Sequence, residues 1–149
     1  MAMTEVSRGI QATTPSAQSK KGLHVGLWVA QGVLAAAFLA SGVMKATAPL
    51  EQLRAAMPWV NGAMGQAVRF IGTVEVLGAL GLVLPAATRI NPWLTSLAAL
   101  GLTTVMLLAA ATHAARGESP MILVNAILGG LAAFVAWGRS RKVPITPRA

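Results

Sequence analysis

The stretch IGTVEVLGALGLVLP, Ile71 to Pro85, is apolar at almost every position and yet contains one ionisable side chain, Glu75. A carboxylate at membrane depth costs about 2.5–3.5 kcal/mol on insertion scales, so a lipid-facing position is disfavoured. Glu75 shares one helical stripe, at spacings of three and four residues, with Gly72, Ala79 and Leu82. The stretch therefore predicts a membrane helix that turns its carboxylate toward other helices.

The composition places the whole chain in a membrane. Apolar residues make up 55% of the 149 positions, charged residues only 11%, and the mean hydropathy is +0.65. Three further uncharged runs are long enough for the roughly 17 residues that a helix needs to cross the hydrocarbon core. They are Leu23 to Met44, Pro92 to Thr112 and Met121 to Trp137.

These runs predict an all-α fold, an antiparallel four-helix bundle that spans the membrane within residues 23–138. The expected helices are Leu23–Lys45, Ala63–Leu84 with Pro85 as its end, Pro92–His113 and Met121–Trp137. Glycines within the spans predict close helix packing: Gly72, Gly78, Gly81, Gly101, Gly129 and Gly130.

A short interfacial helix is expected between the first two spans. Leu50, Leu53 and Met57 recur at helical spacing after Pro49, which suits a first helical turn. Trp59 follows as an interfacial anchor, since tryptophan favours the boundary between lipid and water.

The ends of the chain are expected to lie together in the cytoplasm. Residues 1–22 read as a disordered tail and residues 139–149 as a basic tail. A cleaved signal peptide is the alternative for the first apolar run, but that run exceeds the usual length of such a segment. Eight cations flank the terminal side: Arg8, Lys20, Lys21, Arg89, Arg139, Arg141, Lys142 and Arg148. Four flank the other: Lys45, Arg54, Arg69 and Arg116. The positive-inside rule then places both termini in the cytoplasm.

Several function classes are excluded by the residues present. The net charge of +8 does not indicate nucleic acid, because the cations sit at the ends of apolar runs, where they set topology. The chain has no cysteine, no HExxH motif and no paired carboxylates, so no metal ligand set or catalytic set is recognisable. His24 and His113 are expected at opposite ends of the bundle, too far apart to hold a haem together.

The partner of Glu75 is expected from another helix. Arg69 lies six residues from Glu75, which is about 9 Å of rise and about 120° of rotation along a helix, so the two side chains cannot easily pair within one helix. Arg69 is therefore assigned to the interface between lipid and water. By topology, the other three spans each bring one polar side chain to the same outer half of the bundle: Lys45, His113 and Asn125. Together with Glu75 and Gln31 these residues form the predicted ligand pocket. The alternatives stay open: snorkelling for Lys45, a helix end for His113, and hydrogen bonds between helices for Asn125 and Gln31.

Three pieces of the sequence resemble a known family: SGVMK at Ser41–Lys45, MPW at Met57–Trp59, and the stretch from Ile71 to Pro85. In combination they are similar to the DoxX-like family of bacterial four-helix membrane proteins, over about residues 26–138. The resemblance implies the fold, a location in the bacterial cytoplasmic (inner) membrane, and motif positions for Lys45 and Glu75. Because the family is named after a small subunit associated with a quinol oxidase and with thiosulfate:quinone oxidoreductase, it also implies a quinone-linked accessory role.

Three functions are compatible with this sequence. The first is an accessory subunit of a quinone-linked redox or oxidative-stress system, with quinone or a membrane redox protein as partner. The second is a non-redox binder or transporter of a small amphipathic molecule, with protonation of Glu75 as a switch. The third is a structural or assembly partner whose buried polar residues only set helix register.

Overall fold

The structure is a computed structural model that describes residues 17–148, and it is all-helical over that range. Its elements are α1 (Ala17–Thr47), α2 (Leu50–Ala56), α3 (Gly62–Thr88), α4 (Trp93–Ala115), α5 (Ser119–Trp137) and a π-helical turn, η1 (Gly138–Lys142). Four helices are long and apolar enough to cross a membrane: Gln18–Thr47, Gly62–Thr88, Trp93–Ala115 and Ser119–Lys142. The predicted four-span bundle with a short helix between the first two spans is confirmed.

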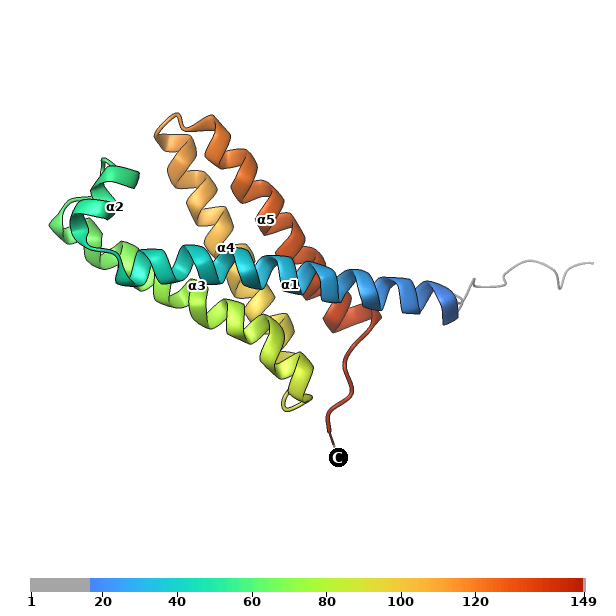
Figure 1. The fold of residues 1–149 in the computed structure, drawn as a ribbon. Helices are drawn as coiled ribbons and strands as arrows, with labels where there is room; N and C mark the ends of the chain where they lie inside the picture. Colours follow the sequence, from blue (N-terminus) through green and yellow to red (C-terminus); the bar gives the residue numbers. More distant parts are fainter. Residues whose placement is uncertain (1–16, 149) are drawn as a thin grey trace, which may run out of the picture.

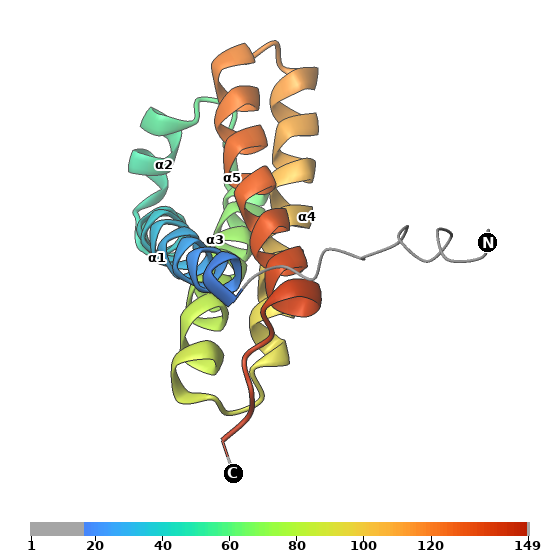
Figure 2. The same cartoon turned by 90° about the vertical axis from the view of Figure 1, so that its right-hand side faces the viewer.

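The four spanning helices form two antiparallel pairs that cross each other. α1 packs along α3, α4 packs along α5, and the pairs meet where α3 contacts α4 and α1 contacts α5. The pairs run in different directions in Figure 1, and in Figure 2 α1 is seen nearly end-on while α4 and α5 stand upright. We call the end with the start of α1, the α3–α4 link and η1 the terminal end, and the end with α2 and the α4–α5 link the loop end.

Helix boundaries differ most from the expectation at the start of α1 and after α5. α1 begins at Ala17 rather than Leu23, because residues 17–21 are good helix formers without proline or glycine. The rest of the tail expected over residues 1–22 lies outside the described residues. η1 continues directly from α5, so residues 139–142 are helical, and Arg139 is buried rather than part of a solvated tail.

Pro85 does not end α3, contrary to the expectation. A proline this close to the end removes one helical hydrogen bond, the one to the Gly81 carbonyl, so the helix can continue to Thr88. The neighbouring carbonyl of Leu82 accepts a hydrogen bond from Gln31 Nε2 of α1 at 2.5 Å. The helix ends instead at Arg89, whose φ of 60° is left-handed.

Small residues set the distances between helices. The buried positions of α3 repeat at alternating spacings of three and four residues: Gly65, Val68, Gly72, Glu75, Ala79, Leu82 and Ala86. At Gly72 an added Cβ would lie 2.7 Å from the Gly42 carbonyl oxygen of α1, and at Gly78 it would lie 2.6 Å from Leu102 of α4. At Gly101 and Gly130 an added Cβ would have no atom within 4 Å, so close helix packing does not explain the glycine at these two positions.

Candidate functional site

Glu75 lies in the interior of the bundle, as its position in the apolar run predicts. Its side chain is 1% exposed. Its Oε1 atom forms an ion pair with Lys45 Nζ at 2.6 Å, and its Oε2 atom accepts a hydrogen bond from Ser41 Oγ at 3.0 Å. Both carboxylate oxygens are therefore bound by side chains of α1, and Lys45 is the cation that the topology argument sought.

The close crossing of α1 and α3 makes this contact possible. Ser41 and Lys45 are four residues apart and lie on one face of α1, where Gly42 meets Gly72 of α3 backbone to backbone. Glu75 lies three residues beyond Gly72 on the same stripe. Ser41 was noted from the sequence only as the first residue of the SGVMK segment and was not identified as a partner of Glu75.

Arg69 does not pair with Glu75, in agreement with the spacing argument. Its guanidinium donates to the carbonyl oxygens of Ala46 at 2.7 Å and Ala48 at 3.0 Å, at the C-terminal end of α1. Cations favour helix C-termini because the last carbonyls lack helical donors. Arg69 thus joins the start of α3 to the end of α1 and holds the chain before α2 in place.

A cavity of about 270 Å³ lies beside the ion pair, between α1, α3 and α4. Its polar lining comes from Lys45, Glu75, Thr112 and His113, and the rest of the lining is apolar or aromatic: Trp59, Phe70, Ile71, Val74, Val105, Leu108 and Ala109. Phe70 is 70% exposed and Leu108 is 65% exposed. Since both also lie on the outer, apolar surface of the bundle, the cavity opens sideways between α3 and α4.

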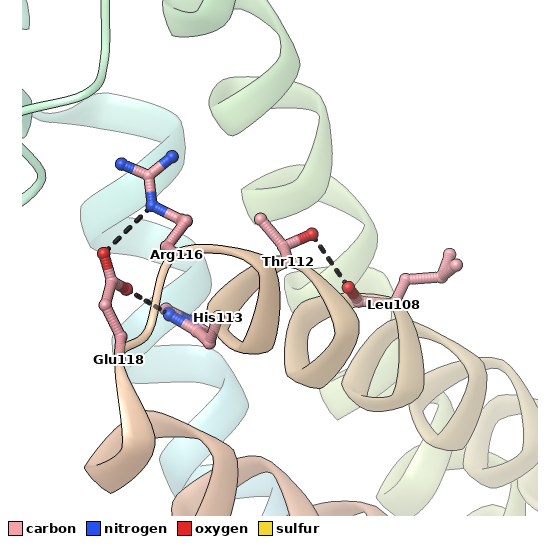
Figure 3. Close-up of polar contacts among 5 residues, drawn as sticks. All are labelled: Leu108, Thr112, His113, Arg116 and Glu118. Atoms are coloured by element: carbon pink, nitrogen blue, oxygen red, sulfur yellow. Dashed lines mark hydrogen bonds and ion pairs between the residues drawn. The ribbon is translucent and has the colours of Figure 1, made fainter.

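His113 lines the cavity and is joined to the α4–α5 link. Figure 3 shows its Nδ1 facing Glu118 Oε2, at 2.5 Å, while Arg116 Nε donates to Oε1 of the same carboxylate at 2.9 Å. These hydrogen bonds, from His113 first and then Arg116, lower the pKa of Glu118 below its ordinary value of 4.5. The Arg116 guanidinium also stacks on the Trp59 ring, 4.3 Å from its centroid. The loop end of the cavity is therefore closed by contacts between Trp59, from the α2–α3 link, and the α4–α5 link.

Two predicted pocket residues are not brought to the cavity. Asn125 is buried on α5 but does not line the cavity, and its Nδ2 has no hydrogen-bond partner among residues 17–148. Gln31 lies nearer the terminal end, where it bonds to Leu82 and its Oε1 accepts from Arg139 Nε at 2.6 Å. No sequence signal pointed to Arg139, because its burial depends on the π-helical turn that follows α5.

Comparison with known proteins agrees with this architecture. The DoxX-like family model matches residues 29–135, which is well over half of the chain and includes Lys45, Glu75, His113 and Asn125. No curated protein and no solved structure matches the chain. The match covers most of α1 and α5 and all of the helices between them, so the chain belongs to the DoxX-like family.

Proposed function

We propose that this protein is an accessory subunit of a quinone-linked redox or oxidative-stress system, and that the cavity beside Glu75 holds the quinone head group. The observation that carries the proposal is the Lys45–Glu75 ion pair in the wall of a largely apolar cavity. Apolar cavities with a few convergent polar groups suit amphipathic small molecules. The volume of about 270 Å³ is at the small end for such sites, so the head group alone would be enclosed.

Lys45 has spare hydrogen-bonding capacity for such a ligand. Its ammonium group has three N–H donors, and within residues 17–148 its only hydrogen bond goes to Glu75. The side chain is 22% exposed and lines the cavity. His113 offers Nε2 as a second polar atom, since its Nδ1 is engaged by Glu118. A quinone head group has two carbonyl oxygens that accept hydrogen bonds, and Lys45 and His113 can supply donors to them.

Glu75 would act by positioning Lys45. Its carboxylate, fixed by Ser41, holds the ammonium group at the cavity wall and balances its charge. The sideways opening between α3 and α4 supports entry of the ligand from the lipid rather than from water. Because the chain has no cysteine and no recognisable metal ligand set, the proposal assigns the metal or flavin chemistry of the system to a partner protein.

Quinone content after purification tests the proposal. We expect wild-type protein in mild detergent to retain a quinone, identified by solvent extraction and mass spectrometry. Glu75→Gln should reduce the quinone-to-protein ratio by at least about tenfold. The variant weakens the charge-assisted hydrogen bond that holds the Lys45 ammonium group at the cavity wall, and a bond of this kind contributes about 1.5–3 kcal/mol. Glu51→Gln is the matched control, since Glu51 is exposed on α2 outside the cavity.

The outcomes separate the three functions. A non-quinone amphiphile that is lost in Glu75→Gln but kept in Glu51→Gln would favour the non-redox binder or transporter. Equal quinone content in all three proteins would refute the proposed site. If Glu75→Gln also lost a partner subunit in pull-down, the structural or assembly role would replace it.

A further inference from the structure

A second polar cluster lies at the terminal end of the bundle, far from the Glu75 cavity. Its centre is Arg139 of η1, which is 3% exposed. Nε of Arg139 donates to Gln31 Oε1 at 2.6 Å, and the guanidinium lies 5.3 Å from the centroid of the Trp28 ring. Nη2 is buried without a hydrogen-bond partner among the described residues.

His24 cannot satisfy both donors that face it. Trp28 Nε1 lies 3.2 Å from His24 Nε2, and Arg139 Nη1 lies 3.2 Å from His24 Nδ1. Indole and guanidinium nitrogens only donate, whereas a neutral imidazole accepts at just one of its two nitrogens. One of these two contacts is therefore not a hydrogen bond. Two donors of the cluster are therefore without an acceptor among the described residues: Arg139 Nη2, and one of the two nitrogens that face His24.

The cluster also lacks a negative charge. Arg139 stays protonated, and a buried charge without a counter-charge is strongly unfavourable. The carboxylates within residues 17–148 are Glu51, Glu75 and Glu118. Glu75 and Glu118 pair with cations of the loop end, and no ion pair of Arg139 is formed with any of the three. An anion from outside this part of the chain, beside Arg139, would supply the missing negative charge.

Arg139 lines a cavity of about 640 Å³ between the first turns of α4, the end of α5 and the segment 144–147. Leu97, Leu100 and Ala136 form apolar walls, and Trp93 and Trp137 stand at its sides. The N-terminus of α4, which is the positive end of its dipole, borders the same cavity at Trp93. Tryptophans of this kind mark the boundary between lipid and water. The cavity thus combines a cationic group at headgroup depth with an apolar surface at acyl-chain depth.

We propose that this cavity binds an anionic phospholipid, with the phosphate beside Arg139 and an acyl chain along Leu97 and Leu100. Basic pockets between spanning helices are a recognised type of anionic-lipid site. Arg141 and Lys142, exposed on the same turn, add long-range attraction for anionic headgroups. A free anion would gain nothing from the apolar walls, whereas an acyl chain buries surface against them. The inference is independent of the quinone proposal, since the two cavities share no residue.

Lipid-dependent thermal stability provides the test. Wild-type protein in zwitterionic detergent is titrated with phosphatidylglycerol, with phosphatidylcholine or with inorganic phosphate, and unfolding is followed by circular dichroism. We expect phosphatidylglycerol alone to raise the Tm. Arg139→Gln should weaken this response at least about tenfold in lipid concentration, because a charge-assisted hydrogen bond is lost. Arg141→Gln, which removes an exposed charge of the same turn, should respond nearly as the wild type does.

A second variant keeps the test valid if Arg139→Gln does not fold. Ser96→Phe places a bulky side chain in the cavity from α4 and changes none of the residues that contact the Arg139 guanidinium. It should also abolish the response to phosphatidylglycerol, while native mass spectrometry shows loss of bound lipid. An equal response in Ser96→Phe and wild type would overturn the proposal. An equal Tm increase with inorganic phosphate would overturn it too, because the site would then bind a free anion.

Discussion

Glu75 is stabilised by two side chains of one neighbouring helix. Lys45 supplies the counter-charge and Ser41 the second hydrogen bond, so each carboxylate oxygen has one donor and the charge is balanced. A buried pair of this kind contributes little net stability relative to apolar residues, because desolvation offsets the attraction. Loss of one partner is much more costly, since it leaves the other charge buried and alone.

The energetic coupling of the pair can be measured directly. We expect Lys45→Met to lower the free energy of unfolding by about 3–5 kcal/mol, because Glu75 is left without a counter-charge. Adding Glu75→Leu should recover most of this loss, since no buried charge remains. Unfolding in mixed micelles, followed by circular dichroism, measures both effects, and Lys142→Met serves as the exposed control. A double variant whose loss equals or exceeds the sum of the single losses would contradict the expected coupling.

Glu118 links stability to pH at the α4–α5 link. Its pKa is lowered in the folded protein by the hydrogen bonds from His113 and Arg116. A lowered carboxylate pKa means that the stabilisation is complete above the unfolded value, 4.5, and is lost as the pH falls through the lower folded value. The Tm difference between wild type and Glu118→Gln should therefore be largest at neutral pH and shrink below about pH 4.5. A difference that grows on acidification would show that the carboxylate is not stabilised in its charged form.

At the scale of elements, the crossing of α1 and α3 positions the site. The two backbones touch at Gly42 and Gly72, only three residues before Glu75. Small residues permit such contacts in membranes, where helices gain little from leaving lipid for one another. The α3–α4 contact differs along its length: it is tight at Gly78 and Gly81, and it widens toward the loop end, where the cavity lies.

A single added methyl group tests this crossing. Gly72→Ala should lower the free energy of unfolding by about 1–3 kcal/mol, because its Cβ would lie 2.7 Å from backbone atoms of α1 that cannot move separately. Gly101→Ala is the matched control, since an added Cβ has nothing within 4 Å there. It should leave stability unchanged or raise it by up to about 1 kcal/mol through helix propensity. Equal losses in the two variants, measured by thermal unfolding, would speak against a tight crossing at Gly72.

At the scale of the molecule, the four spans bring the described ends of the chain to one side of the membrane. The terminal end also carries most of the cations, and from these the positive-inside rule predicts that this end lies in the cytoplasm. The ion pair and the cavity beside it would then lie in the outer half of the membrane, and the Arg139 cavity in the inner leaflet.

Cysteine labelling tests this orientation, because the wild-type chain has no cysteine. Ser119→Cys, at the loop end, should react with an impermeant maleimide in intact cells. Thr146→Cys, at the terminal end, should react only after the cells are permeabilised. The opposite labelling pattern would show that the terminal end faces the outside of the cell, contrary to this prediction.

The fold was predictable largely because few backbone structures can span the hydrocarbon core of a membrane. Runs of about 20 apolar residues must become helices, since no backbone polar group can stay unpaired in hydrocarbon. The burial of Glu75 followed from the same physics, since an ionisable side chain must face the protein. A partner was expected from another helix that reaches the same depth, and the structure identifies it as Lys45. Pro85 was misjudged because a proline in the last turn of a helix removes only one helical hydrogen bond, so the helix can continue to Thr88.

By itself, the sequence determined the number of spans, the stripe of α3 that faces inward and a short set of polar side chains, Lys45 among them, from which a partner of Glu75 was expected. The tertiary structure alone decided which polar residues share a cavity. His113 lines the same cavity as Glu75, Asn125 does not line it, and Gln31 bonds to Arg139 instead. The physical reason is that depth along a helix follows from counting residues at a constant rise, whereas rotation about its axis and the crossing angle depend on contacts with all neighbouring helices.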